Sequence, residues 1–149
     1  MDNIQKVLVI VPAYNEEEAI RKTVETIKSC NNCDVLVVND GSKDNTLQEA
    51  KKTDAIVLDL PSNLGIGGAV QAGYIYALKN DYDIAIQVDG DGQHNPIYIP
   101  EMVKLISDEN YDMIIGSRFI NKTGYKQTFL RMLGINILSL IIKILTGKK

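Results

Sequence analysis

The chain has 149 residues, which is enough for one domain with its own hydrophobic core. Its hydrophobic content of 45% and charged content of 23% are typical of a soluble globular protein. The formal net charge of -3 argues against a nucleic-acid-binding protein that relies on bulk electrostatics, so no nucleic-acid partner is expected. The polar start at residues 1–3 has no signal-peptide pattern, which predicts a cytoplasmic protein.

Continuous apolar runs alternate with helical patterns along most of the chain. Such runs are typical of strands that are buried on both faces of a parallel sheet. The alternation predicts an α/β fold with an open, mostly parallel, Rossmann-like sheet flanked by helices. The predicted strands span residues 6–12, 34–38, 55–58, 84–88 and 112–117, and the predicted helices run from about residue 15 to 29, 45 to 51, 69 to 79 and 96 to 106.

Polar residues and glycine gather where the predicted strands end. Open parallel sheets bind ligands at the carboxyl ends of their strands. The convergence of several such ends on one edge therefore predicts a ligand site there. The residues at these ends are Tyr14 and Asn15, Asp40, the loop at Gly65, Asp89 and Asp91, and Arg118.

Two carboxylates, Asp89 and Asp91, follow the fourth predicted strand with Gly90 between them. Two anions this close repel each other unless a cation lies between them. Mg²⁺ and Mn²⁺ suit such a position, because they take oxygen ligands and leave coordination positions open for phosphate oxygens. An ordinary Asp-Gly turn between two elements is the alternative interpretation.

The segment from residue 128 to 146 is a strongly apolar helix candidate with a wide apolar face. Its polar side chains fall within an arc of about 140°, and two of them, Arg131 and Lys143, are basic. Three interpretations stay open: the helix packs on the sheet or on a partner subunit, lies in a membrane interface, or spans a membrane. The two basic residues interrupt the apolar runs and disfavour the spanning helix. An exposed apolar helix would favour self-association into a homo-oligomer or a membrane.

Five motifs occur in order at residues 11–17 (VPAYNEE), 38–46 (VNDGSKDNT), 63–65 (NLG), 89–94 (DGDGQH) and 116–119 (GSRF). Together they resemble glycosyltransferase family 2, and within it the dolichyl- or polyprenyl-phosphate sugar transferases. The resemblance implies a nucleotide-sugar-binding domain of the GT-A fold over residues 1–127. An amphipathic tail helix over residues 128–149 would form part of the acceptor region. Members of this subgroup continue past that helix, so the resemblance implies a truncated chain with an incomplete acceptor region.

The resemblance also implies roles on the donor side of the site. Asp40 would hydrogen-bond the base of the nucleotide. Asp89 and Asp91 would hold the donor diphosphate through Mg²⁺ or Mn²⁺, with Gln93 as a further ligand. A uridine donor is favoured over a guanosine donor on resemblance alone. The other donor-binding residues would be Pro12, Tyr14, Asn15 and Glu17, which line the nucleoside pocket, and Gly65.

On the acceptor side, Arg118 and Arg131 would face the phosphate of a polyprenyl phosphate. Together with Asp91 they are the residues expected to carry the chemistry, a metal-dependent inverting transfer of the sugar. A metal stabilises the charge that develops on the nucleoside diphosphate as it leaves. A lipid phosphate is already ionised at neutral pH, so it needs no strong general base, and arginine matches its oxygens. The protein would then work peripherally on the cytoplasmic face of a membrane.

Three other functions stay in view. A family 2 transferase with a sugar-hydroxyl or polysaccharide acceptor would need a carboxylate base. A truncated, non-catalytic nucleotide-sugar-binding module would bind the donor without transferring its sugar. A dinucleotide oxidoreductase is disfavoured, because its glycine loop should follow the first strand, whereas the glycines at residues 65–68 follow the third.

Overall fold

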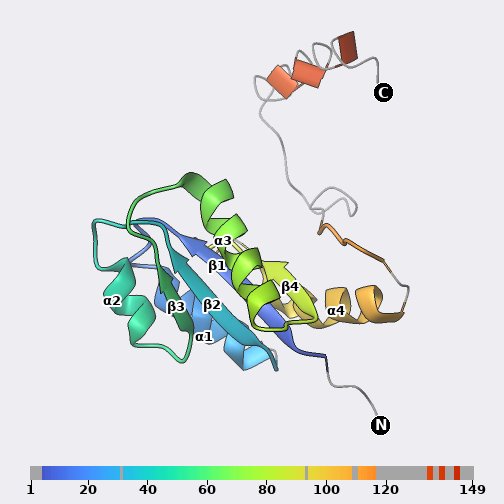
Figure 1. Ribbon diagram of the computed structural model, residues 1–149, viewed down its shortest axis with the longest axis horizontal. Helices are drawn as coiled ribbons and strands as arrows, with labels where there is room; N and C mark the ends of the chain where they lie inside the picture. The colour runs from blue at the N-terminus through green and yellow to red at the C-terminus, as the bar shows by residue number, and fades with distance from the viewer. Residues whose placement is uncertain are drawn as a thin grey trace. The chain divides into compact units, whose positions relative to one another are not determined.

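The computed structural model describes residues 5–30, 32–92, 94–108 and 111–116, together with short pieces at 134–135, 138–139 and 143–144. The chain divides into two compact units, Met1–Ile114 and Ile115–Lys149. The first unit contains a parallel sheet and the helices that cover it (Figure 1). The predicted domain boundary at residue 127 lies outside the described residues.

Four parallel strands form the sheet, in the order β3-β2-β1-β4. The central strand β1 (Val7–Ala13) pairs with β2 (Asp34–Asn39) on one side and with β4 (Ile84–Gln87) on the other. The strand β3 (Ile56–Asp59) pairs with β2 at the outer edge. All seven residues of β1 are buried, as expected for a strand with neighbours on both edges and helices on both faces. The predicted open parallel α/β sheet is thus confirmed.

Helices cover both faces of the sheet, which makes three layers. On one face, Val9 and Val11 of β1 share a hydrophobic core with residues of α1 (Ile20–Cys30), α2 (Thr46–Lys51) and α4 (Ile99–Asp108), which follows the short helix η1 (Pro96–Tyr98). On the other face, Leu8 and Ile10 pack against α3 (Gly65–Lys79), which lies in front of the sheet in Figure 1. Successive side chains of a strand point to opposite faces, so β1 serves both cores.

The predicted fifth strand at residues 112–117 is wrong over its described part, because residues 111–116 form no strand. Met113 is 72% exposed and Ile115 is 77% exposed. Among the described residues, no strand pairs with the outer edge of β4. An apolar run becomes a strand only when a neighbouring strand completes its hydrogen-bond ladder, and residues 111–116 have no such neighbour among the described strands.

The predicted tail helix is described in part. Residues 134–135, 138–139 and 143–144 are helical, and the rest of the segment from 128 to 149 lies outside the described residues. Within the part of the chain that the structure describes, no helix is long and apolar enough to cross a membrane.

Candidate functional site

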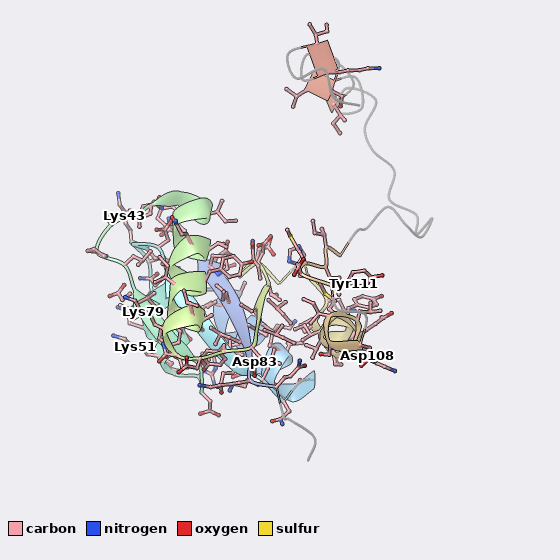
Figure 2. All side chains as sticks on the ribbon, turned by 45° about the vertical axis from the view of Figure 1, so that its right-hand side comes forward. Lys43, Lys51, Lys79, Asp83, Asp108 and Tyr111 are labelled. Carbon is pink, nitrogen blue, oxygen red and sulfur yellow. The ribbon has the colours of Figure 1, made fainter. Side chains whose placement is uncertain are left out.

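A cavity of about 480 Å³ opens where the strands of the sheet end. Its walls come from the end of β1, the loops after β2, β3 and β4, and the first turn of α3. Figure 2 shows Lys43, in the loop after β2, at this end of the sheet, with Lys79 and Asp83 at the opposite end. The predicted site residues that line the cavity are Pro12, Tyr14, Asp40, Gly65, Asp89 and Asp91.

Asp40 forms the buried wall of the cavity and is only 3% exposed. Its Oδ1 accepts a hydrogen bond of 2.7 Å from the backbone N–H of Leu64, and its own N–H donates to the carbonyl of Ala13. The neighbouring Gly41 has φ +66°, and a Cβ there would lie 2.8 Å from the backbone N of Asn63. Asp40 and Gly41 therefore hold the loops after β2 and β3 together, and this contact places the start of α3 at the cavity.

Asn15 and Glu17 tie the loop after β1 to the loop after β2. Asn15 Oδ1 accepts from the N–H of Lys43 at 2.9 Å, and Asn15 N–H donates to Ser42 Oγ at 3.0 Å. Glu17 Oε2 accepts from the backbone N–H of Asn45 at 2.9 Å and from its side-chain amide at 3.0 Å. Both side chains are therefore hydrogen-bonded to the loop after β2. Their predicted contact with a nucleoside stays a prediction.

Asp89 is oriented by two neighbouring side chains. Its Oδ1 accepts a hydrogen bond of 3.1 Å from the amide of Gln87. Its backbone N–H donates to Nδ1 of His94 at 3.2 Å, and Nε2 of the same ring lies 3.7 Å from Asp89 Oδ2. Because Nδ1 accepts this hydrogen bond, Nε2 is the ring nitrogen that faces the carboxylate. The sequence singled out the acidic pair but did not predict that Gln87 and His94 would fix it.

The cavity is strongly acidic. Glu16, Asp40, Asp89 and Asp91 line it, whereas none of its described lining residues is lysine or arginine. Burial raises the pKa of Glu16 above its usual value, and the negative charges of Asp91 and Asp44 raise it further. An anionic ligand would meet repulsion here unless a cation entered with it.

The donor set suits a hard divalent cation, because carboxylate oxygens are the ligands that Mg²⁺ and Mn²⁺ prefer. Asp89 and Asp91 lie on one wall of a cavity large enough to admit a ligand beside them. Over the described residues, no group of three or more His, Cys, Asp or Glu side chains is arranged to enclose an ion.

Two predicted site residues, Asn15 and Glu17, are described but are not among the residues that line the cavity. Gln93, Arg118 and Arg131 lie outside the described residues. Besides Gln87 and His94, the sequence analysis missed Glu16, which lines the cavity, and Thr23, which hydrogen-bonds to Gly90. The available signal for Thr23 was a polar residue on the otherwise apolar, buried face of α1, where a hydroxyl needs a partner.

Comparison with known proteins identifies the fold and the family. Residues 8–147 match the family described as "Glycosyl transferase family 2". The chain belongs to this family. The resemblance noted in the sequence motifs is therefore confirmed, and the sheet with its flanking helices is the GT-A fold.

Named relatives act on lipid phosphates. A UDP-N-acetylglucosamine–dolichyl-phosphate N-acetylglucosaminyltransferase from Methanococcus voltae is 33% identical over 137 residues, covering 80% of this chain and 55% of the relative. An undecaprenyl-phosphate mannosyltransferase from Micrococcus luteus is 34% identical over 119 residues, covering 76% of this chain and 48% of the relative. The chain spans about half the length of the curated relatives it matches.

Solved structures share the fold. TarS from S. aureus superposes with a TM-score of 0.60 and 27% identity, covering 83% of this chain and 39% of TarS. A glucosyl-3-phosphoglycerate synthase from Mycobacterium tuberculosis, solved with Mn²⁺, UDP and phosphoglyceric acid, has a TM-score of 0.56 and 24% identity. The match covers 68% of this chain and 39% of that synthase.

Proposed function

We propose that this chain binds the donor in a metal-dependent, inverting glycosyltransferase that moves a sugar from a nucleoside diphosphate to a polyprenyl phosphate. The observation that carries the proposal is the acidic cavity at the strand ends, with Asp89 and Asp91 on its wall. The family match and the lipid-phosphate substrates in the names of relatives support the reaction class.

Asp89 and Asp91 would hold Mg²⁺ or Mn²⁺ against the donor diphosphate, with Gln93 as the predicted further ligand. When bound, such a cation supplies Lewis-acid stabilisation of the diphosphate leaving group. The chain's own contribution is orientation: Gln87 and His94 fix Asp89 before the ligand arrives. A preoriented carboxylate needs less reorganisation when charge develops in the transition state.

The nucleoside would lie between β1 and the loop after β2. Pro12 and Tyr14 line this part of the cavity, and Asp40 forms its buried wall. Tyr14 is 43% exposed, which leaves an aromatic face open to a planar base. We favour a uridine donor, since one relative carries UDP in its name and a structure of the same fold was solved with UDP.

Arg118 and Arg131 remain the predicted contacts to the phosphate of the acceptor. A phosphate acceptor is ionised at neutral pH, so no general base needs to lie beside the reacting oxygen. The amphipathic tail would bring the protein to the membrane surface that holds the lipid.

Calorimetric titration of the purified chain with UDP and GDP, each with and without Mn²⁺, tests the donor site. We expect UDP to bind only with Mn²⁺, and Asp91→Asn to weaken that binding by at least about tenfold, since even supporting residues of metal ligands cost about 10- to 100-fold. Asp108→Asn removes the same charge at the end of α4 and is the matched control, expected to bind like the wild type.

The result separates the alternatives. Tighter binding of GDP than of UDP would reverse the choice of base but keep the site. Equal UDP binding by the wild type and Asp91→Asn would contradict the metal site, and the acidic pair would then be only a turn. Donor binding without transfer to a polyprenyl phosphate would favour the non-catalytic binding module.

A further inference from the structure

We propose that Thr23 of α1 is a positioning residue that fixes the turn between Asp89 and Asp91 for binding the cation and the donor diphosphate. The inference rests on the proposed function and deepens it. Thr23 itself does not line the cavity, so its effect on a ligand would be transmitted through the turn.

The first observation is a buried hydrogen bond between α1 and the turn. Thr23 is 5% exposed, and its Oγ1 donates to the carbonyl oxygen of Gly90 at 3.2 Å. That carbonyl belongs to the peptide that joins Gly90 to Asp91. Holding it fixes the direction in which the chain leaves Gly90, and therefore the placement of Asp91 relative to Asp89.

The second observation is that the turn is clamped from two sides. A Cβ at Gly90 would lie 2.9 Å from the carbonyl oxygen of Pro12, so the turn packs directly on the end of β1. A Cβ at Gly92, which has φ +73°, would lie 3.4 Å from Thr23 Oγ1. The hydroxyl of Thr23 thus bonds to Gly90 and lies close to Gly92, the two glycines that flank Asp91.

The third observation is that the Thr23 hydroxyl bonds across the fold. A threonine in a helix commonly donates to a carbonyl of its own preceding turn. Thr26, on the same helix, does so and donates to the carbonyl of Lys22 at 2.7 Å. Thr23 instead reaches a loop 67 residues away, from a helix face whose other buried members, Ile20, Val24 and Ile27, are apolar.

Replacing the hydroxyl with a methyl group would leave the Gly90 carbonyl without this donor in a buried place. The turn would then be free to rotate its peptide, and the two carboxylates would be less well oriented for one cation. We expect Thr23→Val to weaken UDP binding in the presence of Mn²⁺ by about three- to tenfold. Thr23→Ser, which keeps the hydroxyl, is expected to bind close to the wild type.

The experiment measures UDP binding by calorimetry, with and without Mn²⁺, for the full chain carrying Thr23→Val, Thr23→Ser or Thr26→Val. Thr26→Val is the matched control, because it makes the same substitution on the same helix at a hydroxyl bonded within the helix. Thermal midpoints are recorded alongside. A merely structural role would lower the midpoint of Thr23→Val and leave its UDP affinity with Mn²⁺ unchanged at a temperature where the chain is folded.

Each outcome decides the matter. Weaker binding by Thr23→Val alone, with rescue by Thr23→Ser, supports the inference. If the wild type binds UDP only with Mn²⁺ and Thr23→Val binds it with the same affinity, this inference is overturned. The proposed function would still stand in that case. A wild type that binds UDP equally without Mn²⁺, or not at all, overturns both. If Thr23→Val does not fold, Thr23→Ala provides the same comparison, because it removes the hydroxyl without filling its place.

Discussion

The Tyr82 hydroxyl shows how one side chain makes the stability of the fold depend on pH. It donates to Asp34 Oδ2 at 2.8 Å, and Lys6 Nζ lies 4.2 Å from the centre of its ring. Burial, the bond to Asp34 and the negative charge of Asp34 together raise the pKa of Tyr82 to about 12, from the usual 10.0. The folded state therefore favours the protonated phenol.

A raised pKa fixes the sign of the pH effect. The stability that Tyr82 contributes is complete below pH 10 and is lost as the pH rises towards about 12. Tyr82→Phe should lower the free energy of unfolding near neutral pH by about 1 kcal/mol, the usual net value of a hydrogen bond. Between pH 10 and about 12, Tyr82→Phe should also lose less stability than the wild type. Urea unfolding at pH values on either side of the window measures both effects.

The control for this prediction is Tyr98→Phe, since Tyr98 is 59% exposed. It is expected to follow the wild type through the alkaline window. Equal alkaline losses of stability in Tyr82→Phe and the wild type would contradict the prediction.

At the same scale, the sequence predicted several of the residues that meet at the cavity but not how each is held. Asp40, Asp89 and Asp91 could be predicted because parallel strands bring their carboxyl ends to one edge. The bonds of Asn15 and Glu17 to the loop after β2 depend on the spacing of two loops, which no local pattern encodes.

Among the elements, α3 shows how closely a helix can approach the sheet. Gly73 faces β1, and a Cβ there would lie 2.3 Å from Cγ2 of the buried Ile10. Gly67 lies on the same helix, and a Cβ there would have no neighbour within 4 Å. The two glycines are thus in the same element but in opposite packing environments.

Gly73→Ala is expected to destabilise the fold although alanine favours a helix. Overpacking costs about 1–3 kcal/mol, against a gain in helix propensity of up to about 1 kcal/mol. Gly67→Ala gains helix propensity without overpacking, so it should raise the free energy of unfolding. Urea unfolding of both variants measures the difference, and a Gly73→Ala variant as stable as Gly67→Ala would show that α3 can move away from β1 at little cost.

Strands could be predicted from the sequence where one connecting helix brings the strand beside its pairing partner. The strands β2, β3 and β4 each follow a helix that returns the chain beside an earlier strand, so each finds a pairing partner close along the chain. The segment at residues 112–117 has the same apolar character, but a strand there would need the outer edge of β4 as its ladder partner. Its described part, residues 112–116, forms no strand, because strand formation depends on a pairing partner as well as on apolar composition.

For the whole molecule, the division into two units places the acidic cavity in one unit and the predicted acceptor residues in the other. The unit Met1–Ile114 contains both hydrophobic cores and all the described residues that line the cavity. The predicted acceptor residues Arg118 and Arg131 belong to the second unit, Ile115–Lys149. We therefore expect the first unit to bind the donor by itself, whereas transfer of the sugar should also need the second unit.

A chain that ends after Gly116 should therefore fold and bind UDP with Mn²⁺ to within about twofold of the full chain, a difference of about 0.4 kcal/mol. Circular dichroism would confirm the fold, and calorimetry would give the affinity.

Arg118→Ala in the full chain is the companion variant, expected to leave UDP binding unchanged because an acceptor residue makes no contact with the donor base or diphosphate. Loss of UDP binding in the folded, shortened chain would contradict the division, since the donor site would then need a residue beyond Gly116. Loss in Arg118→Ala as well would identify that residue and move Arg118 from the acceptor side to the donor diphosphate, where its positive charge would offset the acidic cavity.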